Sequence, residues 1–524
     1  MGIRTFRFDA DKGFFLNGEN RKIKGVCVHH DAGCLGAAVT REVWERRLEA
    51  LKEMGCNAIR TSHNPHMPEL YGLCDEMGFL MMDEAFDEWE NPKNKWSTGH
   101  NVYPPRHQGY FEDFPEWHEK DLAAMVLRDR NHPSVIMWSI GNEIDYPNDP
   151  YCHPLFGEMT GNNDANKPSA ERMYHPDKPN MERLAPIAQE LSAIVKRYDS
   201  TRPVTLAAAF PELSSRLHYF DALDVVGYNY KEHLYEEDHR RFPDLPFLGS
   251  ENGHSYAAWK AVTDHDYISG QFLWTGIDYL GEAHGWPVHG SSAGLLTLAG
   301  FPKARYYQRQ SYWADRPVLH LAAVLYEGSR EEWLPVTESW NYKEGDRVLV
   351  RLFTNQPEAE LFLNGRSLGR KKGLSDEGCM DWITTFEPGI LSASAGELSS
   401  GQGKGCVSCS LETTGEACML LLSDWKACGG NAGEDKKDVP PYHQVEILAA
   451  DAEGRHVADA SLPVTIEVTG PGVLLGLENG DLADNTPYSS PSRKTKEGRL
   501  LAYIRRTCLL YTSSEPTRLR RISY

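Results

Sequence analysis

Two glutamates, Glu143 and Glu251, stand just beyond two short apolar runs of the sequence, Val135–Ile140 and Phe247–Gly249. Two carboxyl groups that flank one bond can cleave a glycoside. The protonated one gives its proton to the leaving oxygen, while the ionised one attacks the anomeric carbon or activates a water molecule. A gap of about 5–5.5 Å between the carboxyl groups would indicate retention of the anomeric configuration, and a wider gap would indicate inversion.

The sequence around the two glutamates favours different roles for them. Glu143 follows a run that contains Trp138. Apolar surroundings and a neighbouring negative charge raise the pKa of a carboxyl group, so we expect Glu143 to be protonated. A hydrogen bond from Tyr230 would favour the ionised form of Glu251.

The elements that must position these residues form a repeating pattern between Lys22 and about Arg316. Short apolar runs, typical of parallel strands buried on both faces, alternate with amphipathic segments. One amphipathic segment, which Thr40 can cap and Gly55 can end, repeats apolar residues at helical spacing. Eight such repeats predict a (β/α)8 barrel rather than an open doubly wound sheet, because no Gly-rich phosphate turn follows the first run. The predicted strands are Ile23–Val28, Ala58–Arg60, Phe79–Asp83, Val135–Ile140, Val204–Ala207, Val225–Tyr228, Phe247–Gly249 and Phe272–Trp274.

Polar and aromatic side chains stand at or just after the ends of these runs. The carboxyl ends of barrel strands form the active site of this fold, so we expect these side chains to converge there. They lack metal-ligand spacing and a nucleophilic Ser or Cys beside a base. Two further carboxylates, Glu84 and Glu282, are rivals that we expect to bind hydroxyls or pair with an arginine. The residues predicted to bind substrate are His29, Arg60, His63, Asn142, Tyr230, Trp274 and Asp278.

After Arg316 the helical patterns disappear and alternating segments predict β-structure. Ala359–Leu363 runs into an Asn364-Gly365 turn, which is typical of a hairpin. We predict two small immunoglobulin-like β-sandwiches after the barrel. The predicted domains are a remnant of a preceding β-sandwich (1–18), the barrel (19–316), two sandwiches (317–428 and 429–507) and a non-native or flexible tail (508–524).

Composition narrows the class of partner. The formal charge of the 524 residues is −20, which argues against nucleic acid and anionic membranes and is compatible with a neutral small molecule. No apolar run is long enough to cross a bilayer, and the first residues lack the apolar core of a signal peptide. The 11 cysteines are odd in number and scattered, which favours reduced thiols.

Several motifs carry a resemblance to a known family. The chain resembles glycoside hydrolase family 2, and within it the β-galactosidases, from about Gly2 to Thr507. The stretch from Asp129 to Glu143, Asp-Arg-Asn-His-Pro-Ser-Val-Ile-Met-Trp-Ser-Ile-Gly-Asn-Glu, is the most specific part of the match. Further matching segments are Gly13-Phe-Phe-Leu-Asn-Gly, Lys24-Gly-Val-Cys-Val-His-His-Asp, Ala58-Ile-Arg-Thr-Ser-His-Asn-Pro, Met82-Asp-Glu-Ala, Asp224-Val-Val-Gly-Tyr-Asn-Tyr, Ser250-Glu251 and Gly270-Gln-Phe-Leu-Trp-Thr-Gly-Ile-Asp-Tyr-Leu-Gly-Glu.

The resemblance implies a role for each site residue. It makes Glu143 the acid/base and Glu251 the nucleophile of a retaining double displacement, and it gives Tyr230 a hydrogen bond to the nucleophile. The resemblance also implies that Asn142 bonds the sugar's 2-hydroxyl. It implies that His29 and His63 bind the sugar and stabilise the transition state, and that Trp274 forms the platform under the sugar ring.

The sequence departs from the family pattern in three places. Members carry two β-domains before the barrel, so we expect this chain to be a fragment that is weak or inactive alone. Some members bind Mg²⁺ near the acid/base through a Glu and a His, whereas Glu88-Trp89-Glu90 stands here without the His, so Mg²⁺ is doubtful and no cofactor is expected. Glucuronidases carry an Asn-x-Lys element beyond the eighth strand, where this chain has Ala299-Gly-Phe-Pro-Lys303.

Together these features predict a retaining exo-β-galactosidase that acts on a small-molecule carbohydrate. A β-glucuronidase or β-mannosidase of the same family, and an inactive or carbohydrate-binding barrel, stay open as alternatives. A homo-oligomer is also left open. A cytoplasmic location is favoured, although a native N-terminus with a signal peptide could be missing.

Overall fold

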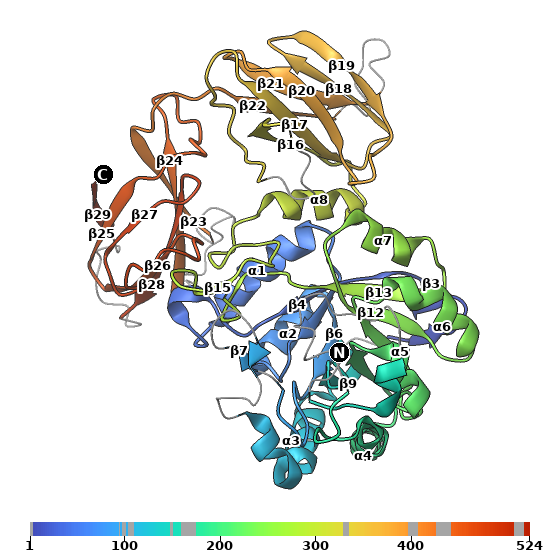
Figure 1. Cartoon of the computed structure of the whole chain (residues 1–524). Coiled ribbons are helices and arrows are strands. Elements are labelled where there is room, and N and C mark those ends of the chain that lie inside the picture. Colours follow the sequence, from blue (N-terminus) through green and yellow to red (C-terminus); the bar gives the residue numbers. More distant parts are fainter. Residues whose placement is uncertain are drawn as a thin grey trace. The chain divides into compact units, whose positions relative to one another are not determined.

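The protein was analysed as a computed structural model, shown in Figure 1. The structure describes residues 4–93, 95–96, 101–102, 109–146, 150–158, 174–283, 285–328, 335–396, 407–425, 442–507 and 518–523. The chain divides into two compact units. The first contains residues 1–30, 56–276 and 282–285, and the second contains 31–55, 277–281 and 286–524. Each unit has its own strands and its own buried side chains.

A closed barrel of eight parallel strands dominates the first unit, which confirms the predicted (β/α)8 TIM barrel. The eight strands follow one another in chain order around the barrel. They are β4 (Ile23–Val28), β5 (Ala58–Thr61), β6 (Leu80–Glu84), β9 (Val135–Asn142), β10 (Val204–Ala208), β11 (Val226–Asn229), β12 (Phe247–Asn252) and β13 (Ile268–Leu273).

The barrel strands are buried along their whole length, except that Lys24 of β4 is partly exposed. Strand β9 runs two residues beyond its predicted end and β12 runs three, so both reach the predicted site. Strand β13 begins at Ile268, four residues before the predicted start, and ends at Leu273. The apolar-run criterion missed its first half because Ser269 and Gln271 are polar, yet both are fully buried in the barrel.

Six α-helices lie among the described residues of the first unit. The predicted helical face that includes Leu184, Ile187 and Leu191 is confirmed, since all three are buried in α4. Helix α3 begins with Phe114-Pro115, and Pro at the first turn is favourable because its missing N–H is not needed there. The helices are α2 (Pro68–Met77), α3 (Phe114–Asp129), α4 (Leu184–Tyr198), α5 (Pro211–Ser214), α6 (Tyr235–Arg241) and α7 (Tyr256–Thr263).

The first described residues form a small sheet in the first unit. Strand β1 (Phe6–Asp9) pairs antiparallel with β2 (Gly13–Leu16), which also pairs with β3 (Glu19–Asn20). Phe14 is buried in one cluster with Ile23 and Ala58, the first residues of two barrel strands. The hairpin therefore packs at the amino ends of the barrel strands, opposite to the ends that carry the predicted site.

The second unit contains α1 (Arg41–Glu53) and α8 (Ala304–Trp313). Helix α1 begins after Thr40 as predicted, but the Thr40 hydroxyl makes no capping hydrogen bond. Gly55 follows the helix with a φ of 99°, a left-handed conformation that suits glycine.

Two all-β regions also belong to the second unit, in agreement with the predicted sandwiches (Figure 1). The first has the sheets β16-β17-β20 and β19-β18-β21-β22, and its core includes Trp340, Leu361 and Leu391. Asn364 and Gly365 both have positive φ and join β18 to β19, so the predicted hairpin is confirmed. The strands are β16 (Leu319–Leu325), β17 (Arg347–Thr354), β18 (Glu358–Leu363), β19 (Arg366–Lys372), β20 (Met380–Thr385), β21 (Ile390–Ala395) and β22 (Val407–Glu412).

The second β-region has the sheets β23-β24-β28-β26 and β27-β25-β29. Strand β23 pairs with β24, so it belongs to this region, although the predicted boundary at residue 428 placed it in the preceding one. Pairing decides the membership, and a single alternating segment does not reveal its partner. The strands are β23 (Met419–Asp424), β24 (Tyr442–Ala450), β25 (Pro463–Thr469), β26 (Gly472–Glu478), β27 (Ser492–Lys494), β28 (Arg499–Arg506) and β29 (Arg518–Ser523).

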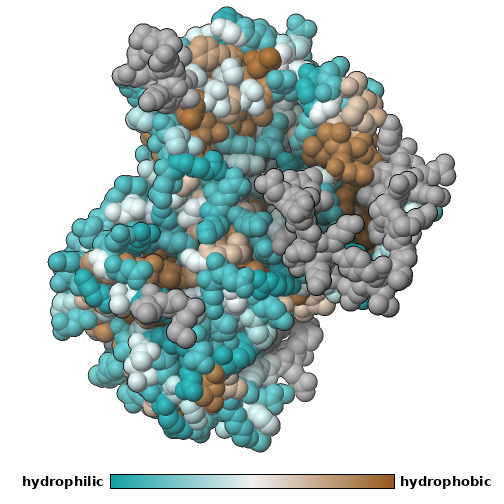
Figure 2. Space-filling view, turned by 180° about the vertical axis from the view of Figure 1, so that it is seen from behind, coloured by the Kyte–Doolittle hydropathy of each residue, from teal (hydrophilic) through white to brown (hydrophobic). Residues whose placement is uncertain are grey.

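Short pieces complete the described chain. Residues 508–517 and 524 of the predicted tail lie outside the described residues, and β29 pairs with β25. Two-stranded sheets are formed by β7 (Lys95–Trp96) with β8 (Asn101–Val102) and by β14 (Tyr279–Leu280) with β15 (Gly290–Ser291). In the part of the chain that is described, no helix combines the length and apolarity needed to cross a bilayer. Hydrophilic residues dominate the face shown in Figure 2, with scattered hydrophobic patches.

Candidate active site

The two predicted catalytic glutamates stand at the carboxyl ends of barrel strands. Glu143 follows the last residue of β9 directly, and Glu251 is the fifth residue of β12. Glu251 is 4% exposed, while Glu143 is partly buried. Because the strands are parallel, their carboxyl ends meet at one mouth of the barrel, which is the active-site end of this fold.

Arg60, at the end of β5, joins several of the predicted site residues. Its guanidinium group is fully buried. Two of its nitrogens donate to the Glu84 carboxylate at 2.8 and 2.9 Å, another donates to Glu251 Oε1 at 2.8 Å, and Nη2 also donates to Asn142 Oδ1 at 2.8 Å. A further bond to the Ser250 carbonyl, at 3.0 Å, engages the remaining donor of Nη1. Arg60 therefore positions the carboxylates and the amide, and its donors are already engaged before any sugar binds.

Glu84, one of the two rival carboxylates, belongs to this network as its counter-ion. Its side chain is fully buried, and it accepts hydrogen bonds from Arg60 and from the Ser139 hydroxyl at 2.7 Å. His63 Nδ1 lies 2.7 Å from Glu84 Oε1. Burial raises the pKa of Glu84, but the Arg60 charge, the bond and charge of His63 and the Ser139 bond together hold it below its usual range. Glu84 is thus an ionised partner of Arg60 and His63, as the ion-pair expectation proposed.

Glu143 has the environment of a carboxylic acid that stays protonated near neutrality. Burial, with the charge of Glu251 as the next cause, raises the pKa of Glu143 to about 7. Lys93, a hydrogen bond from Asn229 and the charge of His63 act in the opposite direction. Asn229 Nδ2 donates to Glu143 Oε1 at 3.2 Å. The electrostatic interaction between Glu143 and Glu251 indicates that the two carboxyl groups share one site.

Tyr230 lies beside Glu251, as predicted. Its backbone N–H donates to the Glu251 carbonyl at 2.8 Å, and its hydroxyl is hydrogen-bonded to the Glu251 side chain. Burial of the hydroxyl and the charges of Glu251 and Glu143 raise the pKa of Tyr230 well above its usual value. The hydroxyl therefore stays protonated and donates to the carboxylate.

Three predicted substrate-binding residues form an aromatic group at the same mouth. The His63 ring stacks on Trp274 with a centroid distance of 5.2 Å and an interplanar angle of 4°. His29 meets both rings edge-on, at 5.9 Å from His63 and 5.2 Å from Trp274. Burial and the neighbouring His63 lower the pKa of His29 to about 3, so His29 is neutral. Burial lowers the pKa of His63, but the hydrogen bond and charge of Glu84 outweigh it and raise the pKa.

Two further acidic residues singled out from the sequence form no described contact with Glu143 or Glu251. Glu282, the second rival carboxylate, is exposed. Asp278 belongs to the second unit, where its carboxylate accepts bonds from Lys303 Nζ at 2.9 Å and from the Gly294 N–H at 2.8 Å. Burial raises the pKa of Asp278 to about 6, although the Lys303 charge opposes the shift. A direct contact of Asp278 with a sugar stays a prediction.

Sequence reasoning missed two charged residues of the site, Asp87 and Lys93. Asp87 Oδ1 accepts hydrogen bonds from Asn142 Nδ2 at 3.0 Å and from Lys93 Nζ at 2.9 Å. Asp87 could have been found, because it stands three residues beyond the end of β6. Lys93 stands in an irregular segment beyond that strand, and no pattern in the sequence singles it out.

The stretch comparable to the family's magnesium site does not offer a free set of ligands. Glu90 forms two hydrogen bonds with Arg183, at 3.0 and 3.1 Å. Glu88 is 3% exposed, and its Oε2 accepts the Lys93 backbone N–H at 3.0 Å. Both acids therefore already have partners in the chain, and the residues do not fit a magnesium ion.

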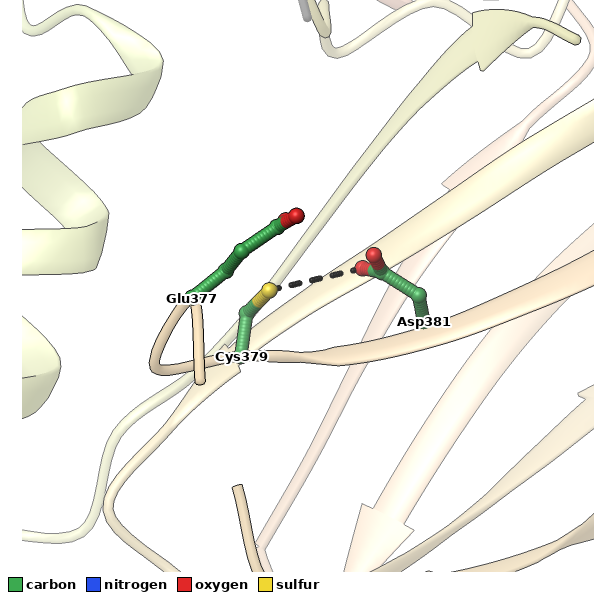
Figure 3. A group of neighbouring side chains, drawn as sticks. All are labelled: Glu377, Cys379 and Asp381. Carbon is green, nitrogen blue, oxygen red and sulfur yellow. Dashed lines mark hydrogen bonds between the residues drawn. The ribbon is translucent and has the colours of Figure 1, made fainter. Parts of the chain in front are cut away.

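A group of metal-ligating side chains lies in the first β-region of the second unit, at Glu377, Cys379 and Asp381 (Figure 3). Cys379 Sγ donates to Asp381 Oδ1 at 3.5 Å. The Arg351 guanidinium pairs with both carboxylates, and its two bonds to Asp381 measure 2.8 and 2.9 Å. Both acids already pair with the arginine, so this group is an ion-pair cluster at the start of β20.

A cavity of about 540 Å³ adjoins His63 in the first unit. The segments after β5 and β6 and one face of α3 line it, with Phe86, Tyr110 and Met125 among the lining residues. Asp87, which bonds Asn142, also lines it. This volume is in the usual range for small-molecule sites.

The chain is similar to known glycosyl hydrolases. Residues 9–293 match the TIM barrel domain of the glycosyl hydrolases family 2, and residues 432–508 match a family 2 C-terminal domain, called domain 5. Residues 345–398 match a domain of unknown function. A β-galactosidase of Bacteroides ovatus is 37% identical over 96% of this chain and 60% of its own length. A β-glucuronidase of Bacteroides fragilis is 26% identical over 71% of this chain and 51% of its own length.

Solved structures give the same family. A glycosyl hydrolase family 2 member from Bacteroides cellulosilyticus has a TM-score of 0.78 and 31% identity, over 97% of this chain and 62% of that one. A β-glycosidase from Bacteroides vulgatus has a TM-score of 0.74 and 28% identity, over 96% of this chain and 63% of that one. Nearly all of this chain is matched by the B. ovatus and B. cellulosilyticus relatives. The chain spans only about 60% of the length of each of them.

Proposed function

The chain belongs to glycoside hydrolase family 2, and from that premise we propose that it carries the catalytic site of a retaining exo-β-galactosidase. The observation that carries the proposal is the network that holds both glutamates. Arg60 donates to Glu251 and to Asn142, while Asn229 donates to Asn142 and to Glu143. Two carboxyl groups in one network, with one pKa raised, are what glycoside cleavage by an acid and a nucleophile requires.

The reaction proceeds in two displacements. Glu143 donates its proton to the glycosidic oxygen as the bond from the anomeric carbon to that oxygen breaks. A carboxylate oxygen of Glu251 forms the new bond to the anomeric carbon, which yields a covalent glycosyl-enzyme. Glu143, now ionised, takes a proton from a water molecule, whose oxygen attacks the anomeric carbon and releases Glu251.

The surrounding residues prepare the two glutamates for these steps. Bonds from Arg60 and Tyr230 orient the Glu251 carboxyl group for attack. Burial keeps Glu143 protonated, so that it can act as the acid. His29, His63 and Trp274 form the wall for the sugar ring, and Asn142 holds its 2-hydroxyl. Arg60 acts through the carboxylates rather than by touching the sugar.

A galactoside is the proposed substrate because the family's recognition element for a charged sugar is missing. Lys303, the lysine beyond the eighth strand, is paired with Asp278 and with the Ser292 carbonyl. The similarity to the B. ovatus β-galactosidase, at 37% identity, supports the same choice. A β-glucuronide remains the second candidate, since relatives of both kinds match. Hydrolysis rates on nitrophenyl β-galactoside, β-glucuronide and β-mannoside separate these substrates.

Variants of the two glutamates test the reaction. We expect Glu251→Gln to abolish turnover on every substrate. Glu143→Ala should retain the first displacement of dinitrophenyl galactoside, seen as a burst of dinitrophenol because this leaving group needs no proton, followed by slow turnover because the second step lacks its base, and it should lose hydrolysis of alkyl galactosides. Glu237→Gln is the matched control, because Glu237 is an exposed glutamate on α6, and it should keep the wild-type rate. Wild-type rates in both Glu143→Ala and Glu251→Gln, or loss in the control alone, would contradict the proposal.

A further inference from the structure

We propose that Lys93 is a positioning residue for Glu143: the Lys93 ammonium group fixes the peptide bond before this glutamate and places a positive charge near its carboxyl group. The inference rests on the proposed function, because it concerns the same acid/base. It goes beyond that function in giving a role to a residue outside the sugar-binding group.

The contacts of Lys93 point at the acid/base. Its Nζ donates to the Asn142 carbonyl at 2.7 Å and to Asp87 Oδ1 at 2.9 Å. Its backbone N–H donates to Glu88 Oε2. The side chain is 12% exposed, so the ammonium group is held in place and is only weakly screened by water.

The Asn142 carbonyl and the Glu143 N–H belong to one peptide bond. Lys93 Nζ donates to the oxygen of this peptide bond. The N–H of the same peptide bond, that of Glu143, donates to the Ala207 carbonyl of β10 at 2.8 Å. Glu143 has a φ of 47°, a left-handed conformation that is unfavourable for a residue with a side chain. The two bonds hold the peptide in the plane that this conformation needs, and so they fix the direction in which the Glu143 side chain leaves the strand.

Asp87 extends this arrangement to the neighbouring side chain. Its Oδ1 accepts hydrogen bonds from both Lys93 Nζ and Asn142 Nδ2. Lys93 and Asp87 therefore hold the backbone and the side chain of Asn142 together. A change at Lys93 would disturb both the acid/base and the amide proposed to hold the 2-hydroxyl.

The charge of Lys93 acts on the acid/base as well. The ionisable groups that face Glu143 are Glu251 on β12, Tyr230 after β11, His63 after β5, and Lys93. The negative charge of Glu251 disfavours the ionised form of Glu143 and raises its pKa. The positive charge of Lys93 favours the ionised form of Glu143 and lowers its pKa. This allows Glu143 to ionise after its first proton transfer and to act as the base in the second step.

Magnesium cannot take this role here, because the acids that would bind it have other partners. Glu88 accepts from the Lys93 backbone, and Glu90 is paired with Arg183. A lysine ammonium group and a divalent cation would both favour the ionised form of a nearby carboxylate. We therefore expect catalysis to be insensitive to EDTA.

The test is a titration of Glu143 in the whole chain by carbon NMR of side-chain-labelled glutamate, with the signal assigned by its loss in Glu143→Gln. We expect Lys93→Met and Lys93→Gln to raise the pKa of Glu143 by about one unit, and Lys93→Arg to restore it. Lys93→Gln keeps a hydrogen-bond donor and removes the charge, so it isolates the charge if Lys93→Met fails to fold. Nearby charges commonly shift a pKa by one unit or more. If the pKa of Glu143 changes by less than about 0.3 unit in a folded variant with a neutral residue at position 93, the inference is overturned.

The matched control is Lys196→Met. Lys196 Nζ pairs with Asp224 at 2.6 Å and donates to the Arg202 carbonyl at 2.9 Å, so it too has one carboxylate and one carbonyl as partners. Its contacts do not include the Glu143 peptide. An equal shift in this control would also overturn the inference, since the shift would then reflect net charge alone.

The titration separates this inference from the proposed function. It reads the acid/base directly, even if the chain hydrolyses no galactoside. If hydrolysis is observed and the titration is unchanged in Lys93→Gln, the inference fails while the proposed function stands. In an active preparation, the basic limb of the kcat/KM profile should move to higher pH by the same amount as the titration.

Discussion

At the scale of single residues, the site gives two similar carboxyl groups different partners, and the pKa of Glu143 is raised. Glu251 accepts bonds from Arg60 and Tyr230, whereas the Glu143 carboxyl accepts one from the neutral amide of Asn229 and is exposed to the charge of Glu251. The difference lies in the neighbours rather than in the glutamates, because both have the same intrinsic acidity.

The raised pKa of Glu143 predicts the pH dependence of hydrolysis. An acid must be protonated to act, and the pKa of Glu143 is raised to about 7. We expect kcat/KM to fall as the pH rises through about 7, whereas a carboxyl group with its usual pKa would lose activity near 4.5. Initial rates between pH 4 and 9 on an alkyl galactoside provide the measurement. A basic limb near 4.5, or none below pH 9, would contradict the assignment of Glu143 as the acid.

Arg60 should be important for stability, because it is the partner of two buried carboxylates. Removing one member of a buried ion pair leaves an uncompensated charge, which costs about 3–5 kcal/mol. We expect Arg60→Met to lower the free energy of unfolding of the barrel by that amount, measured by urea denaturation. Arg240→Met is the control, since Arg240 pairs with Glu236 on the surface of α6, and its loss should cost less than about 1 kcal/mol. Equal losses in the two variants would show that the network adds nothing.

The types of residue at the site were predictable, but only some of their partners were, such as Tyr230 for Glu251. Glu143, Glu251, His29, His63, Asn142, Tyr230 and Trp274 could be selected because polar or aromatic groups at strand ends are informative in a barrel. The role of Arg60 as a partner of Glu251 depends on a contact between β5 and β12, which no local pattern encodes. Lys93 was missed for the same reason, because its target is a backbone carbonyl.

At the scale of elements, the strand ends decide how the glutamates are presented. The predicted strands ended early at β9 and β12, because Gly141, Asn142 and Ser250 lack the apolar character that defined a run. In the barrel these residues are buried all the same, since the network satisfies the side chains of Asn142 and Ser250. Polar residues at the active end of a barrel strand thus break the pattern by which strands are recognised.

Close packing between strands predicts where a glycine is required. Gly25 of β4 pairs with Phe272 of β13, and a Cβ at Gly25 would lie 2.3 Å from the Phe272 ring. Phe272 is fully buried, so we expect Gly25→Ala to destabilise the barrel by about 1–3 kcal/mol in urea denaturation. Gly253→Ala is the matched control, because a Cβ there meets nothing within 4 Å, and its effect should be small. A neutral Gly25→Ala would contradict the packing of this strand pair.

At the scale of the whole molecule, the chain is built from units with separate cores. The sandwich that follows the barrel has its own cluster of buried side chains around Leu361 and Trp340. Its fold class could be predicted from the sequence, because alternation and the Asn364-Gly365 turn are local signals. The membership of β23 could not be predicted, because it depends on pairing with β24, and residues 426–441 between them lie outside the described part of the chain.

Separate cores predict separate responses to mutation. Leu361 is fully buried, and we expect Leu361→Ala to lower the free energy of unfolding of the second unit by about 2–5 kcal/mol. The barrel transition should be unchanged when the variant is followed by scanning calorimetry. Ile383→Ala, at a 43% exposed position of the same sandwich, is the control with a small expected effect. A single transition that shifts as a whole would contradict the division into units.

The central claim is that Glu251 attacks the sugar and Glu143 protonates the leaving group within one site. The most direct test is mass spectrometry of the protein after incubation with 2-deoxy-2-fluoro-β-galactosyl fluoride, whose leaving group needs little protonation. We predict one covalent fluorogalactosyl adduct, located on Glu251 by peptide mapping, which is retained in Glu143→Ala and absent in Glu251→Gln. An adduct on Glu143, Glu84 or Glu282, or an adduct that persists in Glu251→Gln, would contradict the account.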